Sequence, residues 1–324
     1  MKKLYLAVAV AGFTMASGIS QAQQGVIQSD LDASLRLGLE LETEPDAELE
    51  FNNFSSRIRW NAEAGLSDEL QAIGYLELGF DQDNGVNGTR QAWLGVQGDF
   101  GSVKGGKQYT AFYDAVTSVV DIAFFNSCFL EIGCTRQSSV VKYAGNADAD
   151  IQFTASSTLI GGDPGGDFID GLEVAAITTR NEIRFGVGAN ILFGEDDVVD
   201  GIDVESDTGI GLGISAQKRM GDATASASIQ YANSDFFGTD DNTFIFTGTY
   251  GVGNQYALFS IGDNDVTPYF LTYGYVLDIV PDRALVYFEA GLEEPDIDGQ
   301  DANVFGRAVM ILDFDVLSNS LETL

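Results

Sequence analysis

Hydrophobic and polar residues alternate with a period of two along most of this chain. From Asp30 to Leu41 the odd positions are all leucine or alanine, whereas the even positions are polar or glycine. The segments Thr208 to Gln217 and Ala223 to Ala232 repeat this pattern. Successive side chains of a β-strand point to opposite faces, so each such segment predicts a strand with one apolar and one polar face.

The same alternation divides the rest of the chain into sixteen predicted strands. Their approximate ranges are 30–41, 54–66, 70–81, 88–98, 101–109, 138–145, 149–158, 169–178, 182–193, 207–219, 222–234, 242–250, 254–261, 267–277, 283–292 and 302–314.

Short and long connections between these strands alternate. Ser67-Asp68-Glu69 and Met220-Gly221-Asp222 are examples of the short ones, whereas residues 42–53, 194–207 and 293–301 are longer and acidic. Short periplasmic turns at one end and long extracellular loops at the other are typical of bacterial outer-membrane barrels. We therefore predict an all-β fold, a closed antiparallel transmembrane β-barrel of about 16 strands in the outer membrane of a Gram-negative bacterium.

Alternation alone does not say which face of each strand lies outside. Lipid cannot satisfy backbone N–H and C=O groups, so a sheet in the membrane must close on itself. A barrel of about sixteen strands is too wide for side chains to fill and leaves an aqueous channel. The apolar set therefore faces lipid and the polar set faces water in the lumen.

The first 22 residues have the features of a secretory signal peptide. Lys2 and Lys3 precede an apolar run, Leu4 to Gly18, that is too short to cross a bilayer, and Ser20-Gln21-Ala22 offers small residues at a cleavage site. We expect cleavage before Gln23, which leaves residues 23–324 as the barrel domain.

The connection from Thr110 to Gln137 is unusually apolar for a surface loop. It holds four phenylalanines as well as the acidic residues Asp114, Asp121 and Glu131. Such a segment is expected to fold against an inner surface rather than lie in water. We interpret it as an inward-folded loop that narrows the pore; packing on a neighbouring subunit or capping of the barrel mouth are the alternatives.

The predicted register directs a group of arginines into the lumen. If Ile58 and Trp60 face lipid, Arg57 and Arg59 face inward, next to Arg36 on the preceding strand. Opposite the loop carboxylates they would set a transverse field across the pore. Ordinary ion pairing that stiffens the wall would use the same residues, and both interpretations stay open.

Charge and cysteine content narrow the function further. The formal net charge is −33, and loss of Lys2 and Lys3 with the signal peptide makes it −33 − 2 = −35. This acidity argues against nucleic acid as a partner and predicts a cation-preferring pore for small hydrophilic solutes and ions. Cys128 and Cys134 lie six residues apart in an exported chain, so we expect a local disulfide.

Part of the chain resembles the general porins of Gram-negative bacteria. The similarity lies in Ser56-Arg57-Ile58-Arg59, in Gly65 to Leu70, in Arg90 to Val103, and in Gly106-Lys107-Gln108-Tyr109 before the long loop. The resemblance implies a sixteen-stranded homotrimer whose third loop folds inward. It also places Arg57 and Arg59 among the basic residues of the pore wall, and Lys107 where the family usually has arginine. Porins of this family usually end in an aromatic residue, whereas this chain ends in Leu324.

Three other functions known for barrel proteins are the alternatives. Barrel hydrolases use histidine to activate a nucleophile, and this sequence has none, so we expect no enzymatic activity and no cofactor. A surface-binding barrel could hold Ca²⁺ through acidic loops, although such loops are more often solvated or bridged by divalent ions to lipopolysaccharide. The carboxylates concerned are Glu195, Asp196, Asp197, Asp200, Asp203 and Glu205. A sugar-selective channel is the third, because an aromatic-rich loop could stack on sugars.

Overall fold

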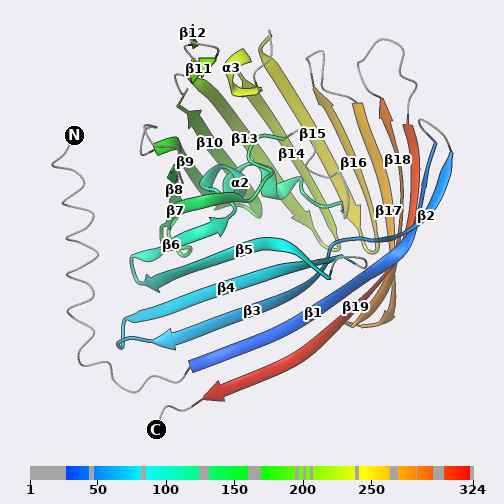
Figure 1. The fold of residues 1–324 in the computed structure, drawn as a ribbon, viewed down its shortest axis with the longest axis horizontal. Helices are drawn as coiled ribbons and strands as arrows, with labels where there is room; N and C mark the ends of the chain where they lie inside the picture. The colour runs from blue at the N-terminus through cyan, green and yellow to red at the C-terminus, as the bar shows by residue number, and fades with distance from the viewer. Residues whose placement is uncertain are drawn as a thin grey trace.

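The computed structural model describes residues 27–43, 47–81, 85–123, 131–159, 169–193, 197–199, 202–204, 207–237, 241–262, 269–281, 283–294 and 303–321. Within these residues seventeen antiparallel strands form one sheet that closes on itself (Figure 1). They are β1 (Ile27–Glu42), β2 (Glu48–Asn53), β3 (Ser56–Gly65), β4 (Leu70–Asp81), β5 (Gly85–Gly98), β6 (Gly101–Gln108), β7 (Gln137–Ala144), β8 (Ile151–Leu159), β9 (Ile169–Arg180), β10 (Ile183–Leu192), β13 (Gly209–Met220), β14 (Ala223–Ala232), β15 (Thr243–Val252), β16 (Gln255–Gly262), β17 (Tyr269–Val280), β18 (Ala284–Glu294) and β19 (Asn303–Leu321).

The barrel closes between its first and last strands. β1 pairs with β19 from Ile27 opposite Leu321 to Glu42 opposite Phe305. The two strands lie side by side in Figure 1, one blue and one red. β2 and β3 both pair with β1, at its upper and lower parts, and so share one position in the wall. The predicted closed antiparallel barrel of about sixteen strands is therefore confirmed.

Three segments differ from the prediction. The acidic loop expected at 42–53 contains β2, and the loop expected at 194–207 contains the separate hairpin of β11 (Asp197–Val199) and β12 (Ile202–Val204). Both segments are rich in acidic residues, which favour loops, although apolar and acidic residues still alternate in β2. The last strand runs to Leu321, whereas the sequence pattern predicted an end at 314. A bulge opposite Leu31 adds one residue to β19, so the alternation of apolar and polar residues changes phase there and the pattern no longer predicts a strand.

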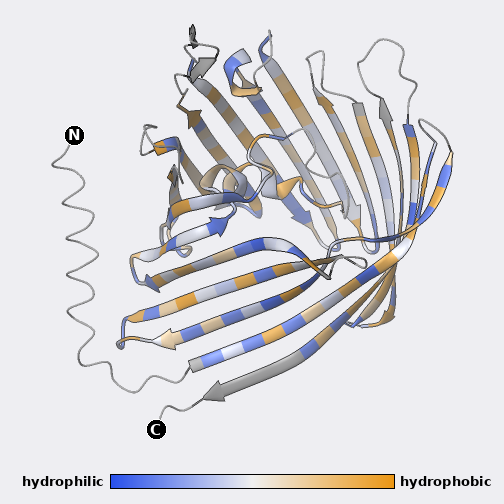
Figure 2. Ribbon diagram, in the orientation of Figure 1, coloured by the Kyte–Doolittle hydropathy of each residue, from blue (hydrophilic) through white to orange (hydrophobic). Residues whose placement is uncertain are grey.

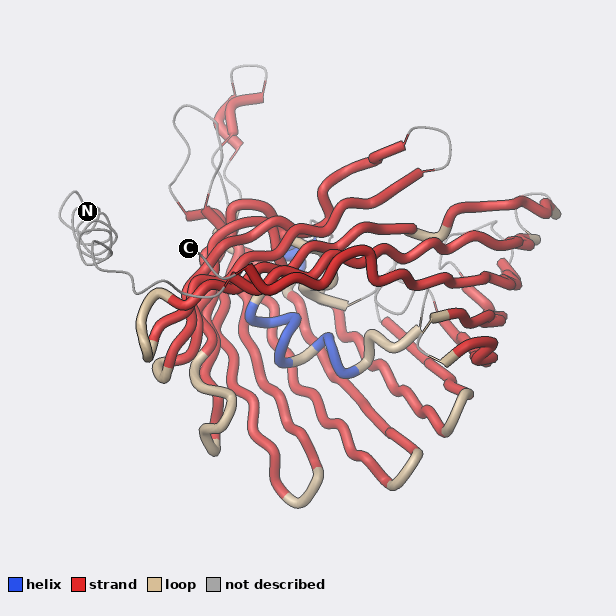
Figure 3. The backbone as a smooth tube through the Cα atoms, turned by 90° about the horizontal axis from the view of Figure 1, so that it is seen from below, coloured by secondary structure: helices blue, strands red, loops and turns tan. Residues whose placement is uncertain are grey.

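Alternation along the strands separates the two surfaces of the wall. On β13 the apolar residues Ile210, Leu212 and Ile214 are exposed on the outside, whereas Gly213 and Ser215 on the opposite face are buried. Figure 2 shows the same striping along the strands of the wall. The short turns gather at one end of the barrel (Figure 3). We call this end the turn end.

The helices of the described residues are short. α2 (Ala111–Ala115) and the 3₁₀ helix η2 (Thr117–Val119) lie within the ring of strands, and α3 (Ser234–Phe237) follows β14 (Figures 1 and 3). None of these helices is long and apolar enough to cross a membrane. The predicted signal peptide, residues 1–22, lies outside the described residues.

Candidate functional site

The long loop is bound to the inner wall at the start of α2. The backbone N–H of Ala111 donates to Ser156 Oγ at 2.9 Å, and that of Phe112 donates to Glu173 Oε2 at 2.8 Å. Asn190 Nδ2 donates to the other oxygen of Glu173 at 2.9 Å. The first N–H groups of a helix have no partner within the helix, so a carboxylate and a hydroxyl on the wall satisfy them directly.

The end of α2 is bound by groups of opposite character. Arg184 on β10 donates to the carbonyl oxygen of Ala115 at 3.2 Å and also to that of Asp114. Ser215 on β13 donates to the same Ala115 oxygen at 2.8 Å. The last carbonyl groups of a helix need donors, and a cation there is favoured by the local dipole. α2 is therefore held at both ends, across four strands of the wall.

Glycines make the close approach of α2 to this wall possible. A Cβ atom on Gly186 would overlap the carbonyl oxygen of Ala115, and one on Gly213 would lie 2.6 Å from Phe112 Cζ. Gly188 also faces Phe112. Phe112 and Val116 are fully buried as a result. The alternating glycines of β10 and β13 are thus the sequence signal for the docking surface of the loop.

The returning part of the loop is anchored farther round the barrel. The backbone N–H of Ile132 donates to Gln230 on β14 at 2.7 Å, and Thr117 donates to the Ile132 carbonyl at 2.7 Å. Thr247 on β15 donates to the carboxylate of Glu131, which is only 6% exposed. Glu131 therefore binds the loop to the wall instead of facing the open lumen, unlike the position expected for a pore-lining acid.

The other two loop carboxylates lie in separate interactions. Asp114 pairs with Lys142 on β7, whose Nζ is 2.7 Å from Asp114 Oδ2. Asp121 accepts a hydrogen bond from the Tyr113 hydroxyl at 2.6 Å. Burial, and secondly the Asp121 carboxylate, raise the pKa of Tyr113, so its hydroxyl stays protonated and continues to donate.

Tyr113 belongs to a short stack at the base of the loop. Its ring lies parallel to that of Tyr109, with 3.8 Å between the ring centroids. The guanidinium of Arg136 covers Tyr109 at 4.5 Å from the centroid. The stack joins the two ends of the loop to each other.

The predicted basic wall lies on β1 and β3, and a further arginine on β5 joins it through a carboxylate on β4. Arg59 Nε is 2.5 Å from Asp32 Oδ1, and Arg57 is 3.6 Å from Glu77. Arg36 donates to Ser34 Oγ at 3.1 Å. Arg90 on β5, which the sequence did not single out, pairs with the same Glu77 at 2.5 Å. Two arginines therefore share one carboxylate, and Arg36, Arg90 and Arg136 are all close enough to act electrostatically on Arg57.

Lys107 does not join this group in the structure. It pairs with Ala92 across β5 and β6, in register with the face on which Leu94 and Val103 are exposed. Lys104 occupies the inner face of β6 instead, with its Nζ 4.3 Å from the centroid of the Trp93 ring. Register, rather than motif position, decides which of the two lysines faces the lumen.

Two further predictions fall on residues outside the described ranges. Cys128 is one of them, so its disulfide with Cys134 stays a prediction. Of the acidic residues considered for Ca²⁺, Glu195, Asp196, Asp200 and Glu205 lie outside the described ranges, and the side chains of Asp197 and Asp203 are not described. Elsewhere in the described residues no group of three or more His, Cys, Asp or Glu side chains could hold a metal ion.

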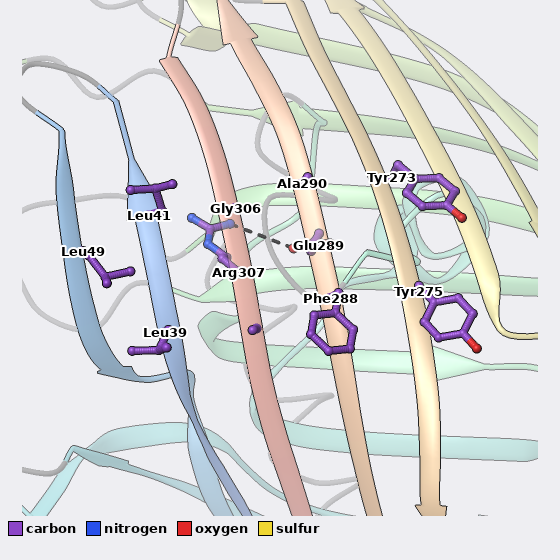
Figure 4. A pocket seen from close by; sticks show the side chains of 11 residues that line it. Leu39, Leu41, Leu49, Tyr273, Tyr275, Phe288, Glu289, Ala290, Gly306 and Arg307 are labelled. Carbon is purple, nitrogen blue, oxygen red and sulfur yellow. Dashed lines mark ion pairs between the residues drawn. The ribbon is translucent and has the colours of Figure 1, made fainter.

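The outer surface carries an apolar groove of about 390 Å³ where β1 and β2 approach β17 to β19 (Figure 4). Leu39 and Leu41 line one side, and Tyr273 and Tyr275 line the other. The groove lies on the same face as the exposed leucines of β1, so it meets lipid or a neighbouring barrel and is not part of the solute path.

A closed antiparallel barrel with an apolar exterior, a polar inner wall and a loop docked inside it defines an outer-membrane channel. The model of the Gram-negative porin family matches residues 6–294, and the chain belongs to that family.

Relatives with assigned names agree with this family. A protein named "Monosaccharide porin" from Halomonas sp is 25% identical over 307 residues, covering 81% of this chain and 80% of that protein. Porin-like protein H of Photobacterium profundum is 26% identical over 117 residues, only 35% of its length. Major outer membrane protein P.IB of Neisseria sicca is 30% identical over 166 residues, covering 48% of this chain and 46% of that protein.

Solved structures share the fold at low sequence identity. The anion-selective porin from Comamonas acidovorans superposes with a TM-score of 0.69 at 14% identity, covering 89% of this chain and 100% of the other. OmpT of Vibrio cholerae in its trimer form gives 0.64 at 20% identity, covering 89% and 99%. At these identities the likeness shows the fold alone.

Proposed function

We propose that this porin is a passive diffusion pore for small hydrophilic solutes and ions, narrowed by the loop 110–137 against the arginines of β1, β3 and β5. The observation that supports this most strongly is the binding of α2 at both ends, through Glu173 and Arg184. A segment held in this way occupies the lumen permanently, because its release would leave buried polar groups without partners.

We also infer that the pore prefers cations. The mature chain carries a net charge of −33 − 2 = −35, and an acidic lumen and mouth concentrate cations. The arginines around Glu77 act against this preference locally. Their effect is to retain some anion passage and to orient dipolar solutes, while the overall sign of the selectivity follows the total charge.

A homotrimer in lipopolysaccharide-containing bilayers is part of the proposal. The Vibrio cholerae OmpT structure is described as a trimer form, and the apolar exterior of β1 and β19 offers a continuous surface for a neighbouring copy or for lipid. Catalysis is not part of the proposed function.

Thiol modification in single-channel recordings tests the constriction. Ser118 on η2 is half-buried, and Ser118→Cys is nearly isosteric. A charged methanethiosulfonate reagent should lower the conductance of Ser118→Cys in a step. Phe153→Cys, on the lipid-facing side and 64% exposed, should be labelled without a change in conductance, and treated wild type controls for the native cysteines. Complete labelling of Ser118→Cys with unchanged current would contradict a pore-narrowing loop.

A sugar-selective channel is the second candidate. The Halomonas relative is named a monosaccharide porin, and cavities at the turn end of the lumen combine apolar surface with amide and hydroxyl groups.

A further inference from the structure

Two adjoining cavities lie on the inner wall at the turn end, beyond the docked loop. One has a volume of about 450 Å³ and lies beside the turns that follow β13 and β15; the other, of about 530 Å³, lies beside the turns that follow β9 and β13. Gln217 and Arg219 line both. We call the two cavities together the turn-end vestibule.

The side chains of the turn-end vestibule belong to the lumenal face. On β13, Gln217 and Arg219 continue the alternation of Ser215, which contacts α2 inside the barrel. Thr224 on β14 is paired with Arg219, and Thr249 on β15 with Ser226. Directly opposed residues share a face of the sheet, so these groups all point into the pore.

One wall of the smaller cavity, beside the turns that follow β13 and β15, is apolar. Ile122 reaches it from the loop, Tyr256 from β16 and Val276 from β17. Ile122, Tyr256 and Val276 belong to one cluster with Phe270 and Phe305, which fixes their positions. The loop thus supplies part of a firm apolar surface on its turn-end side.

The facing wall presents neutral hydrogen-bonding groups. Gln217 and Asn254 offer amide donors and acceptors, and Thr224 and Thr249 offer hydroxyls. Gln217 already donates to Ser226 Oγ at 3.2 Å, which fixes the orientation of its amide. An amide that is oriented by its neighbours binds a ligand at a lower entropic cost.

A sugar ring has the complementary surface. Its C–H faces are apolar, whereas its edge carries hydroxyl groups that each donate and accept. Ligand sites combine apolar area with a few placed polar groups and typically have volumes of about 300–1,000 Å³. Arg219 and Asp222 carry opposite charges and both lie at the rim of the cavity, so the site favours neither anionic nor cationic ligands.

We propose that the turn-end vestibule is a binding site for a neutral polyhydroxylated solute of one or two sugar rings. This inference rests on the proposed diffusion function and adds a substrate class and a location to it. The site lies beyond the loop, so a solute that has passed the constriction is retained there before it leaves the barrel.

Current block by solutes in planar bilayers tests the inference on the refolded full-length mature porin. Glucose and maltose should cause transient blocks that saturate with concentration. Polyethylene glycol 200, a flexible polyether of comparable size, should lower the current only in proportion to its effect on bulk conductivity. Block by a benzoate probe with none by either sugar would overturn the assigned class.

A pair of variants locates the site. Gln217→Ala/Thr224→Ala should weaken the sugar block about tenfold, as expected for the loss of two neutral hydrogen bonds. Gln71→Ala/Gln97→Ala is the matched control. The amides of Gln71 and Gln97 are hydrogen-bonded to each other at 2.8 Å, and they lie at the turn end on another part of the wall. The control should leave the block unchanged.

The two proposals fail in different ways. Channels that conduct ions normally but show no sugar block beyond the polyether effect overturn the vestibule alone. Equal weakening in both double variants likewise overturns the assigned location. Folded protein that inserts into bilayers without conducting overturns the diffusion function itself.

Discussion

Lys142 and Asp114 join the wall of the barrel to the loop inside it, with 2.7 Å between Nζ and Oδ2. Lys142 also donates to the carbonyl oxygen of Tyr109 at 2.8 Å, so one ammonium group holds both the base of the loop and α2. Its side chain is largely buried. An ammonium group in this environment depends on its carboxylate partner, because burial without a counter-charge is costly.

The first prediction concerns this pair. Asp114→Asn should leave Lys142 without its counter-charge, lower the stability by about 1–3 kcal/mol and increase the noise of the open channel as α2 loosens. The double variant Asp114→Asn/Lys142→Met should recover part of the stability. Denaturant unfolding in detergent measures the stability, and single-channel noise spectra measure the mobility of α2. If the losses of stability in Asp114→Asn and Lys142→Met simply add in the double variant, the two residues are not coupled.

The second prediction concerns the glycine surface beneath α2. Gly186→Ala places a methyl group against the Ala115 carbonyl oxygen, so α2 must move away from the wall. Overpacking of this kind costs about 1–3 kcal/mol. Gly105→Ala is the control, because a Cβ at Gly105 meets no atom within 4 Å. Conductance and thermal unfolding should change for Gly186→Ala and stay near wild type for Gly105→Ala; the same response in both would remove the glycine surface from the explanation.

Most of the barrel could be predicted from the sequence, because the wall is a local pattern repeated many times. Each strand position shows its alternation within about ten residues, and only a bulge, such as that at Asp315 and Leu317 in β19, disturbs the phase. β2 is hard to predict because its acidic residues favour a loop, although Leu49 and Phe51 alternate with them.

The contacts of the loop could not be predicted in the same way. Ser215 is 100 residues from its partner Ala115, and Gln230 is 98 residues from Ile132. Nothing local in the sequence relates such pairs. Glu131 illustrates the consequence, because its charge predicted a pore-lining acid and its long-range contact with Thr247 makes it an anchor.

The third prediction concerns the seam where the barrel closes. Arg307 on β19 pairs with Glu40 on β1 and lies 3.9 Å from Glu289 on β18, whose side chain is fully buried. Arg307→Met should cost about 3–5 kcal/mol, because it removes the cation from a buried carboxylate. Arg283→Met is the matched control: its pair with Asp315 is exposed, and such pairs contribute about 0–1 kcal/mol. The temperature at which each variant loses its folded mobility on SDS gels should separate them clearly, and equal temperatures would contradict a stabilising role for the seam.

The fourth prediction concerns ion selectivity. Arg57 and Arg90 share Glu77, so their side chains together carry one uncompensated positive charge on the wall. A unit positive charge acts on an ion about 8 Å away in water with about 0.5 kcal/mol, so it lowers the local concentration of a cation about twofold and raises that of an anion about twofold. Arg57→Ala/Arg59→Ala removes two such charges and should therefore raise the cation-to-anion permeability ratio on the order of tenfold at low salt, with a smaller change at high salt because the field is screened. Arg180→Ala, an exposed residue paired with Asp150 at the turn end, should leave the ratio close to wild type. Reversal potentials in a salt gradient measure the ratio, and an unchanged value for the double variant would show that these arginines stiffen the wall without acting on passing ions.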